Sequence, residues 1–209
     1  IMLGFIMKMK RDHGYVTEIL DLGGGYGVRY TENDPVIDIA DNIRQVAEAL
    51  KATAAGLGID LPSIRLEPGR SIVADAGMTL YTVGTVKRIP GYKNYVSVDG
   101  GMTDNPRFAL YRSAYTVFIA NKMNEKCDME CSVVGRCCES GDIIQEHVMV
   151  PSSVCRGDIC AVATTGAYNY SMASNYNRIG RLPVAMINNG KTSLAVLRET
   201  LEDIVANDM

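Results

Sequence analysis

The sequence lacks the features that mark nucleic-acid and membrane proteins. Its 209 residues carry 21 Lys and Arg against 24 Asp and Glu, a formal net charge of −3, which argues against a basic surface for nucleic acid. No segment reaches the roughly 18 to 20 apolar residues that a membrane-spanning helix needs. The apolar residues 1–7 precede basic residues rather than follow them, the wrong order for a secretory signal. We therefore expect a cytoplasmic protein with neither kind of partner.

The sequence also has few metal ligands in a usable spacing. Its six cysteines include no C-x-x-C pair, and the chain has two histidines, His13 and His147. Structural zinc sites are built from such pairs, so no metal site is expected. The neighbouring Cys137 and Cys138 cannot form an unstrained disulfide with each other. We interpret all the cysteines as thiols in a reducing compartment, most of them small buried side chains.

What is present is the composition of an ordinary globular protein, 47% hydrophobic and 22% charged. Residues 1–75 alternate between helical and extended patterns. We predict an amphipathic helix over 1–13, a strand over 17–22, a helix opened by Pro35 and ended by Gly56 and Gly58, and a strand over 63–67. Strands separated by helices form βα units with a parallel sheet. This part therefore resembles the end of a βα barrel.

From about residue 76 the helical periodicity disappears, and short segments rich in Val, Ile, Thr and Tyr alternate with turn residues. A short helix is expected over 200–206. The predicted strands are 78–89, 92–98, 115–120, 131–136, 158–163, 184–187 and 193–197. Many short strands separated by turns are typical of a β-sandwich or β-barrel. The expected fold class is α/β plus all-β, with one domain over 1–75 and another over 76–209.

Two motifs in the first part suit anion binding. Residues 22–27 (LGGGYG) follow a strand, and consecutive glycines let backbone N–H groups converge on a phosphate. A dinucleotide fingerprint would need a helix to begin at once, and here extended residues follow. Residues 67–70 (EPGR) also follow a strand, where a Gly beside an Arg can bind phosphate or carboxylate. The glycine motif alone fits equally well a turn that binds no ligand, and EPGR alone fits better a surface turn with a solvated arginine.

Three further motifs lie in the second part: residues 98–111 (VDGGMTDNPRFALY), 138–142 (CESGD, preceded by Cys137) and 165–177 (TGAYNYSMASNYN). Each one alone is more often a turn than a site. Five such motifs at strand ends favour a functional site.

Together these motifs resemble the diaminopimelate decarboxylases, within the alanine-racemase-like group of enzymes that use pyridoxal 5'-phosphate (PLP). The resemblance runs from Leu22 to near Met209. The glycine motif and EPGR identify only the group, whereas DNPRFALY with CESGD points to the substrate. The resemblance implies the C-terminal part of a PLP-binding TIM barrel followed by a β-domain. It also implies decarboxylation of meso-2,6-diaminopimelate to L-lysine and carbon dioxide, the last step of lysine biosynthesis.

The resemblance assigns roles to individual residues. Cys138 is the implied proton donor, and since Cys138 and Glu139 reach the partner's active site in the family, a homodimer is implied. The implied cofactor-binding residues are Gly24, Gly25, Glu67, Pro68, Gly69, Arg70 and Tyr168. The implied substrate-binding residues are Arg70, Arg107, Tyr111, Glu139 and Tyr168.

These residue types suit the chemistry. PLP accepts the electrons released by decarboxylation, while the protein orients the substrate and supplies a proton. A thiol can serve as general acid, and we expect Cys138 in this role because it, and not Cys137, precedes Glu-Ser-Gly-Asp. Adjacent strand residues point to opposite faces, so the two thiols should not share an environment. Arginines and Glu139 would recognise the second carboxylate and ammonium of diaminopimelate.

The family's cofactor-bearing lysine lies upstream of the glycine motif, and none of the lysines here stands in that setting. We therefore expect this chain alone to be inactive, with an open barrel edge. Two alternatives remain: another PLP-dependent decarboxylase, acting on a basic amino acid or carboxynorspermidine, or a non-catalytic binding or regulatory homologue.

Overall fold

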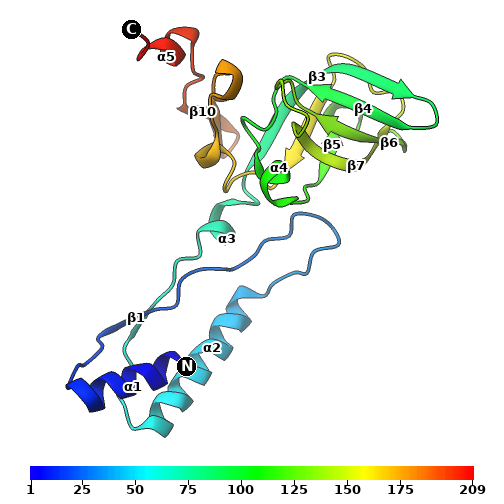
Figure 1. The fold of residues 1–209 in the computed structure, drawn as a ribbon. Coiled ribbons are helices and arrows are strands. Elements are labelled where there is room, and N and C mark those ends of the chain that lie inside the picture. The colour runs from blue at the N-terminus through cyan, green and yellow to red at the C-terminus, as the bar shows by residue number, and fades with distance from the viewer. The chain divides into compact units, whose positions relative to one another are not determined.

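The computed structural model describes all residues from 1 to 209, and the chain folds as two compact units (Figure 1). The first comprises Ile1–Arg29 and Asp34–Ile72, and the second comprises Tyr30–Asn33 and Val73–Met209. None of the helices is long and apolar enough to cross a membrane.

Two helices form most of the first unit. Helix α1 (Met2–His13) ends at Gly14, whose φ of 66° closes the last turn in the left-handed conformation that glycine adopts readily. Helix α2 (Ile39–Leu57) begins after Asp38, whose side chain accepts a hydrogen bond from the backbone N–H of Asp41 at 2.9 Å. The predicted start at Pro35 is therefore wrong by four residues, because Asp38 supplies the cap.

Strands β1 (Ile19–Asp21) and β2 (Ser63–Arg65) pair in parallel, as the βα pattern predicts, although both are shorter than expected. The buried side chains around them are few: Leu3, Ile6, Leu20 and Ala54. The EPGR motif follows β2, and its Gly69 begins the short helix α3 (Gly69–Val73). Two paired strands do not make a barrel, and no closed βα barrel exists within this chain.

The second unit is built on a six-stranded sheet in the order β5-β8-β3-β4-β6-β7. The outermost strands β5 and β7 also contact each other, so the sheet is nearly closed and barrel-like. The β4–β6 pair is parallel and the other pairs are antiparallel. The strands are β3 (Met78–Ile89), β4 (Lys93–Val98), β5 (Val117–Ile119), β6 (Cys127–Val134), β7 (Ile143–Pro151) and β8 (Ile159–Ala163).

The core of this sheet is apolar and β-branched, which explains why the strand pattern predicts most of it. The fully buried side chains include Val83, Val96, Val133, Ile144 and Val162. Strand β7 was not predicted. The polar run at 145–147 interrupts its apolar pattern, and His147 has a φ of 57° where the register with β6 shifts.

The chain ends in an exposed hairpin and a short helix, both predicted in outline. Strands β9 (Val184–Asn188) and β10 (Lys191–Val196) are antiparallel. Positive φ values at Asn189 and Gly190 suit the two-residue turn between them. Helix α5 (Leu201–Val205) begins with a capping box in which Thr200 and Asp203 bond each other's backbone N–H.

All the cysteines are free thiols, but the expectation that most are buried is wrong. Only Cys131 and Cys160 are buried, because they point into the sheet core. No cluster of His, Cys, Asp and Glu side chains could hold a metal ion.

Candidate functional site

The glycine motif forms a turn after β1 that packs against the EPGR segment. Gly23 N donates to Asp21 Oδ1 at 2.7 Å, and Gly23 O accepts from Glu67 N at 2.8 Å. Gly24 is required by space, since a Cβ there would lie 3.0 Å from the carbonyl carbon of Glu67. Gly25 is required by conformation, with a φ of 87°.

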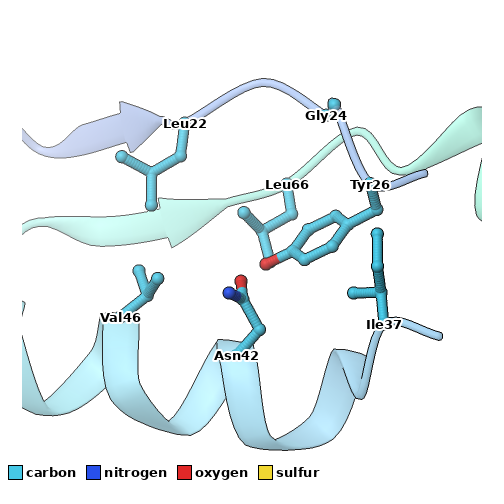
Figure 2. A pocket seen from close by; sticks show the side chains of 8 residues that line it. Leu22, Gly24, Tyr26, Ile37, Asn42, Val46 and Leu66 are labelled. Carbon is cyan, nitrogen blue, oxygen red and sulfur yellow. The ribbon is translucent and has the colours of Figure 1, made fainter. Parts of the chain in front are cut away.

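The amides of Gly24 and Gly25 make no hydrogen bond within the chain. A cavity of about 340 Å³ adjoins them. Figure 2 shows the ring of Tyr26 lying across this cavity, with its hydroxyl end toward Leu66 and Asn42. Two exposed glycine amides beside a cavity suit an anionic group such as a phosphate.

The EPGR segment is held by its own backbone. Gly69 N donates to Glu67 O at 2.9 Å, and Ser71 Oγ donates to Pro68 O at 3.0 Å. Arg70 is half-buried in the first turn of α3. The first unit thus brings Gly24 and Gly25 beside Glu67, with Pro68, Gly69 and Arg70 directly after it.

In the second unit, Arg107 begins the short helix α4 (Arg107–Tyr111) and is 92% buried, with 8% of its surface exposed. Its Cζ atom lies 5.2 Å from the ring centroid of Tyr168 and 5.5 Å from that of Tyr111, both within cation–π range. The structure therefore brings together three of the residues expected to bind substrate.

Arg107 lacks a charged partner within the chain. Its Nη2 donates to Ser113 Oγ at 3.3 Å, its Nε is buried without a partner, and no carboxylate forms an ion pair with it. A buried cation without a counter-ion is costly. An anionic ligand would supply the missing charge.

A polar network that sequence reasoning missed supports this arginine. Tyr115 is buried and its hydroxyl donates to Asn169 Oδ1 at 3.3 Å. Burial raises the pKa of Tyr115 to about 12, with the Arg107 charge opposing the shift. Asn169 directly follows Tyr168, so this contact anchors the loop that carries the second tyrosine. Tyr115 opens a predicted strand and Asn169 lies within the motif 165–177, but no sequence signal indicated that the two side chains meet.

The CESGD motif forms a tight turn after β6, not the continuation of a strand. The predicted strand over 131–136 ends at Val134, so Cys137 and Cys138 do not lie on opposite faces of a strand. They nevertheless differ. Cys138 is exposed, whereas Cys137 is partly buried, and burial together with the nearby Asp142 raises the pKa of Cys137 to about 11.

Glu139 is exposed and charged. Its Oε1 accepts from Gly141 N and from Ser140 Oγ, both at 3.2 Å. These bonds, the Gly141 amide foremost, lower the pKa of Glu139 below its usual value. A carboxylate held ionised in this way suits an ammonium group.

The three motifs of the second unit are joined to one another. Cys138 N donates to Asn177 Oδ1 at 2.7 Å, which ties the cysteine turn to the loop after Tyr168. Ser174 N donates to Thr103 O at 3.0 Å, which ties that loop to the segment before Arg107. Arg107, Tyr111, Cys138, Glu139 and Tyr168 therefore belong to connected loops of one unit.

The chain is similar in sequence to one protein family. Residues 15–166 match the model of the pyridoxal-dependent decarboxylase C-terminal sheet domain. Diaminopimelate decarboxylase of Bacillus subtilis is 49% identical over 97% of this chain and 46% of its own length. The Staphylococcus aureus enzyme of the same name is 45% identical over 97% of this chain and 48% of its own.

Solved structures of proteins from the same family have a similar fold. The diaminopimelate decarboxylase of M. jannaschii in complex with L-lysine superposes with a TM-score of 0.86 at 33% identity, covering 99% of this chain and 46% of that one. The chain spans about half the length of the curated relatives it matches. By sequence and by fold, this chain belongs to the pyridoxal-dependent decarboxylase family and contains its C-terminal sheet domain.

Proposed function

We propose that the complete protein to which this chain belongs decarboxylates meso-2,6-diaminopimelate to L-lysine and carbon dioxide in the cytoplasm, using PLP. The observation that carries the proposal is Arg107, a buried guanidinium between Tyr111 and Tyr168 with no carboxylate partner in the chain. Diaminopimelate has a second carboxylate that monocarboxylate amino acids such as ornithine lack. The names of the similar proteins support the same substrate.

The residues of the first unit fit the phosphate of PLP. The amides of Gly24 and Gly25 are available beside a cavity, and Glu67 closes against Gly24. We assign residues 1–75 to the last βα units of a TIM barrel and 76–209 to the sheet domain. In this assignment Gly24, Gly25 and the segment from Glu67 to Arg70 hold the phosphate, with Arg70 also reaching a substrate carboxylate and Tyr168 touching both cofactor and substrate.

When bound, PLP supplies the electron sink that stabilises the carbanion left by loss of carbon dioxide. The residues of this chain provide recognition and proton delivery. Arg107, its planar guanidinium steadied by two aromatic rings, binds the distal carboxylate through paired N–H donors, with Tyr111 beside it. Glu139, held ionised, binds the distal ammonium. The Cys138 thiol donates a proton to the carbon that has lost its carboxylate.

We further propose that the enzyme is a homodimer in which Cys138 and Glu139 serve the partner's active site. Both residues are exposed on a short turn, as a group that projects into a neighbouring subunit would be.

The test is carbon dioxide release by the complete protein loaded with PLP. We expect turnover with meso-2,6-diaminopimelate and little with L-ornithine or L-lysine, since losing a group that a buried polar site is built to bind costs roughly 10⁴–10⁵ in specificity. Comparable turnover of L-ornithine would instead favour a decarboxylase for basic amino acids. No turnover with any of them would favour a non-catalytic homologue.

A further inference from the structure

One buried carboxylate joins the two loops that the proposed function depends on most. Asp142 is 4% exposed. Its Oδ1 accepts from Met102 N at 2.6 Å, and its Oδ2 accepts from Cys137 N at 2.6 Å. Met102 lies on the segment that leads to Arg107, and Cys137 precedes Cys138. Each oxygen thus binds a different loop.

The surroundings leave room for this carboxylate and nothing larger. A Cβ on Gly101 would lie 2.6 Å from both oxygens of Asp142, and a Cβ on Gly135 would lie 2.5 Å from its Cγ. Real Cβ atoms do not approach so closely, so a side chain at either position would displace the carboxylate. Neither glycine has a positive φ. The requirement for glycine at both positions is therefore one of space around Asp142.

Other contacts in the same place are between backbone groups and bring the same loops together. Arg136 N donates to Gly100 O at 3.0 Å, and Gly135 N donates to Asp142 O at 2.9 Å. Asp104 also lies nearby, and its Oδ2 accepts from Gly101 N at 3.0 Å. Among these contacts, Asp142 is the side chain that bonds directly to both loops.

We propose that Asp142 is a positioning residue, whose carboxylate holds the turn carrying Cys138 and Glu139 in register with the segment carrying Arg107. This rests on the proposed function, in which Cys138 delivers the proton and Arg107 binds the substrate carboxylate. If Cys138 serves the partner's site, the same carboxylate connects the proton donor of one active site to the carboxylate-binding arginine of the other.

The buried environment also accounts for two adjacent cysteines with different roles. Burial, and after it the negative charge of Asp142, raise the pKa of the Cys137 thiol to about 11 and keep it protonated. Cys137 is thus part of the packing around the carboxylate. Cys138, on the exposed side of the turn, is left for chemistry.

The test compares Asp142→Asn with Asp128→Asn in the complete protein. Asp128 is a matched control in the same sheet domain, because its Oδ1 also accepts from a backbone amide, that of Ser152 at 2.8 Å. Asn at 142 keeps the shape but presents an NH₂ group to one of the two amides. Losing a hydrogen bond to a charged group changes the equilibrium constant for opening of the bonded segment roughly ten- to a hundredfold. We expect the amides of Met102 and Cys137 to exchange hydrogen roughly tenfold faster, with no change there in the control.

The second readout is proton delivery. With meso-diaminopimelate, we expect Asp142→Asn to lower kcat roughly ten- to a hundredfold, because small misplacements of a catalytic group are costly, while PLP affinity is unchanged. We also expect more turnovers in which the proton is misdelivered, which with water would release pyridoxamine phosphate and the corresponding amino aldehyde in place of L-lysine, and we expect the ratio of pyridoxamine phosphate to L-lysine to rise. A merely structural role would lower activity without changing the ratio of pyridoxamine phosphate to L-lysine released.

Gly101→Ala provides an independent variant, since it displaces the carboxylate without removing its charge, and we expect the same pattern. Wild-type amide exchange and an unchanged product ratio in Asp142→Asn would overturn the proposal. So would complete unfolding of both Asp142→Asn and Gly101→Ala, which would make Asp142 a determinant of folding. If the unaltered protein does not decarboxylate diaminopimelate, the proposed function fails, whereas amide exchange still decides whether Asp142 holds the two loops.

Discussion

The guanidinium of Arg107 lies over the ring of Tyr168, with its Cζ atom 5.2 Å from the ring centroid. These residues are far apart in the sequence, and Tyr168 reaches the arginine from a left-handed backbone conformation with a φ of 64°. The aromatic face favours the positive charge and leaves the edge of the guanidinium plane for a ligand.

This relationship predicts the effect of Arg107→Lys in the complete protein. Lysine keeps the charge but loses the planar geometry that pairs two N–H donors with a carboxylate. We therefore expect kcat/KM for meso-diaminopimelate to fall roughly ten- to a hundredfold, which corresponds to a loss of about 1.5–3 kcal/mol of transition-state stabilisation. PLP affinity should stay constant. Steady-state kinetics and a PLP titration on the same sample measure both. An effect within about ±0.5 kcal/mol, as at an ordinary surface position, would remove Arg107 from the site.

The two neighbouring cysteines should respond differently to alanine. Cys138→Ala is expected to cut kcat by roughly 10²–10⁴, the usual contribution of a positioned general acid. Cys137→Ala should reduce it far less, because that thiol is partly buried with its pKa raised to about 11. Turnover and cofactor absorbance of both variants provide the measurement. Equal activity of the two, or greater sensitivity at Cys137, would contradict the assignment of Cys138.

This chain alone should not bind PLP covalently, since none of its lysines follows the family's pattern for the cofactor lysine. The check is absorbance after PLP addition and removal of free cofactor, followed by borohydride treatment and mass analysis. A persistent imine band in the folded chain, with one lysine labelled stoichiometrically, would refute this expectation.

The C-terminal segment should loosen in acid through Glu199. Hydrogen bonds from Arg181, first among its partners, lower the pKa of Glu199 to about 2. A carboxylate whose pKa is lower in the folded state stabilises the folded state fully at pH values above its unfolded-state pKa of about 4.3. That stabilisation is lost as the pH falls toward the folded-state pKa of about 2. The amide of Arg181, which donates to Glu199 Oε2 at 2.7 Å, reports this directly.

We therefore expect exchange of the Arg181 amide, corrected for the intrinsic rate, to accelerate between about pH 4 and pH 2. In Glu199→Gln the amide should be less protected at neutral pH, with no such acid transition. Protection that is independent of pH in the unaltered chain would show that the pair does not hold this segment.

The sequence predicts the strands of the second unit where apolar, β-branched residues alternate, as in Met78–Ile89, whose bounds match the prediction. It does not predict Ile143–Pro151, where Gln145 and Glu146 break the pattern. Sequence patterns report local preference, whereas that strand exists because β6 pairs with it along one edge.

The site divides in the same way. The motifs in the sequence, through their resemblance to a known family, supplied the candidate residues of the site, whereas each motif alone fitted a turn that binds no ligand. That Arg107 is buried between Tyr111 and Tyr168 without a counter-ion depended on tertiary structure. The role proposed for Asp142 also depends on tertiary structure, because nothing in the CESGD motif indicates that this carboxylate is buried. Its bonds to Met102 and Cys137 join the loops that follow the paired parallel strands β4 and β6, and burial is a property of that packing rather than of the local sequence.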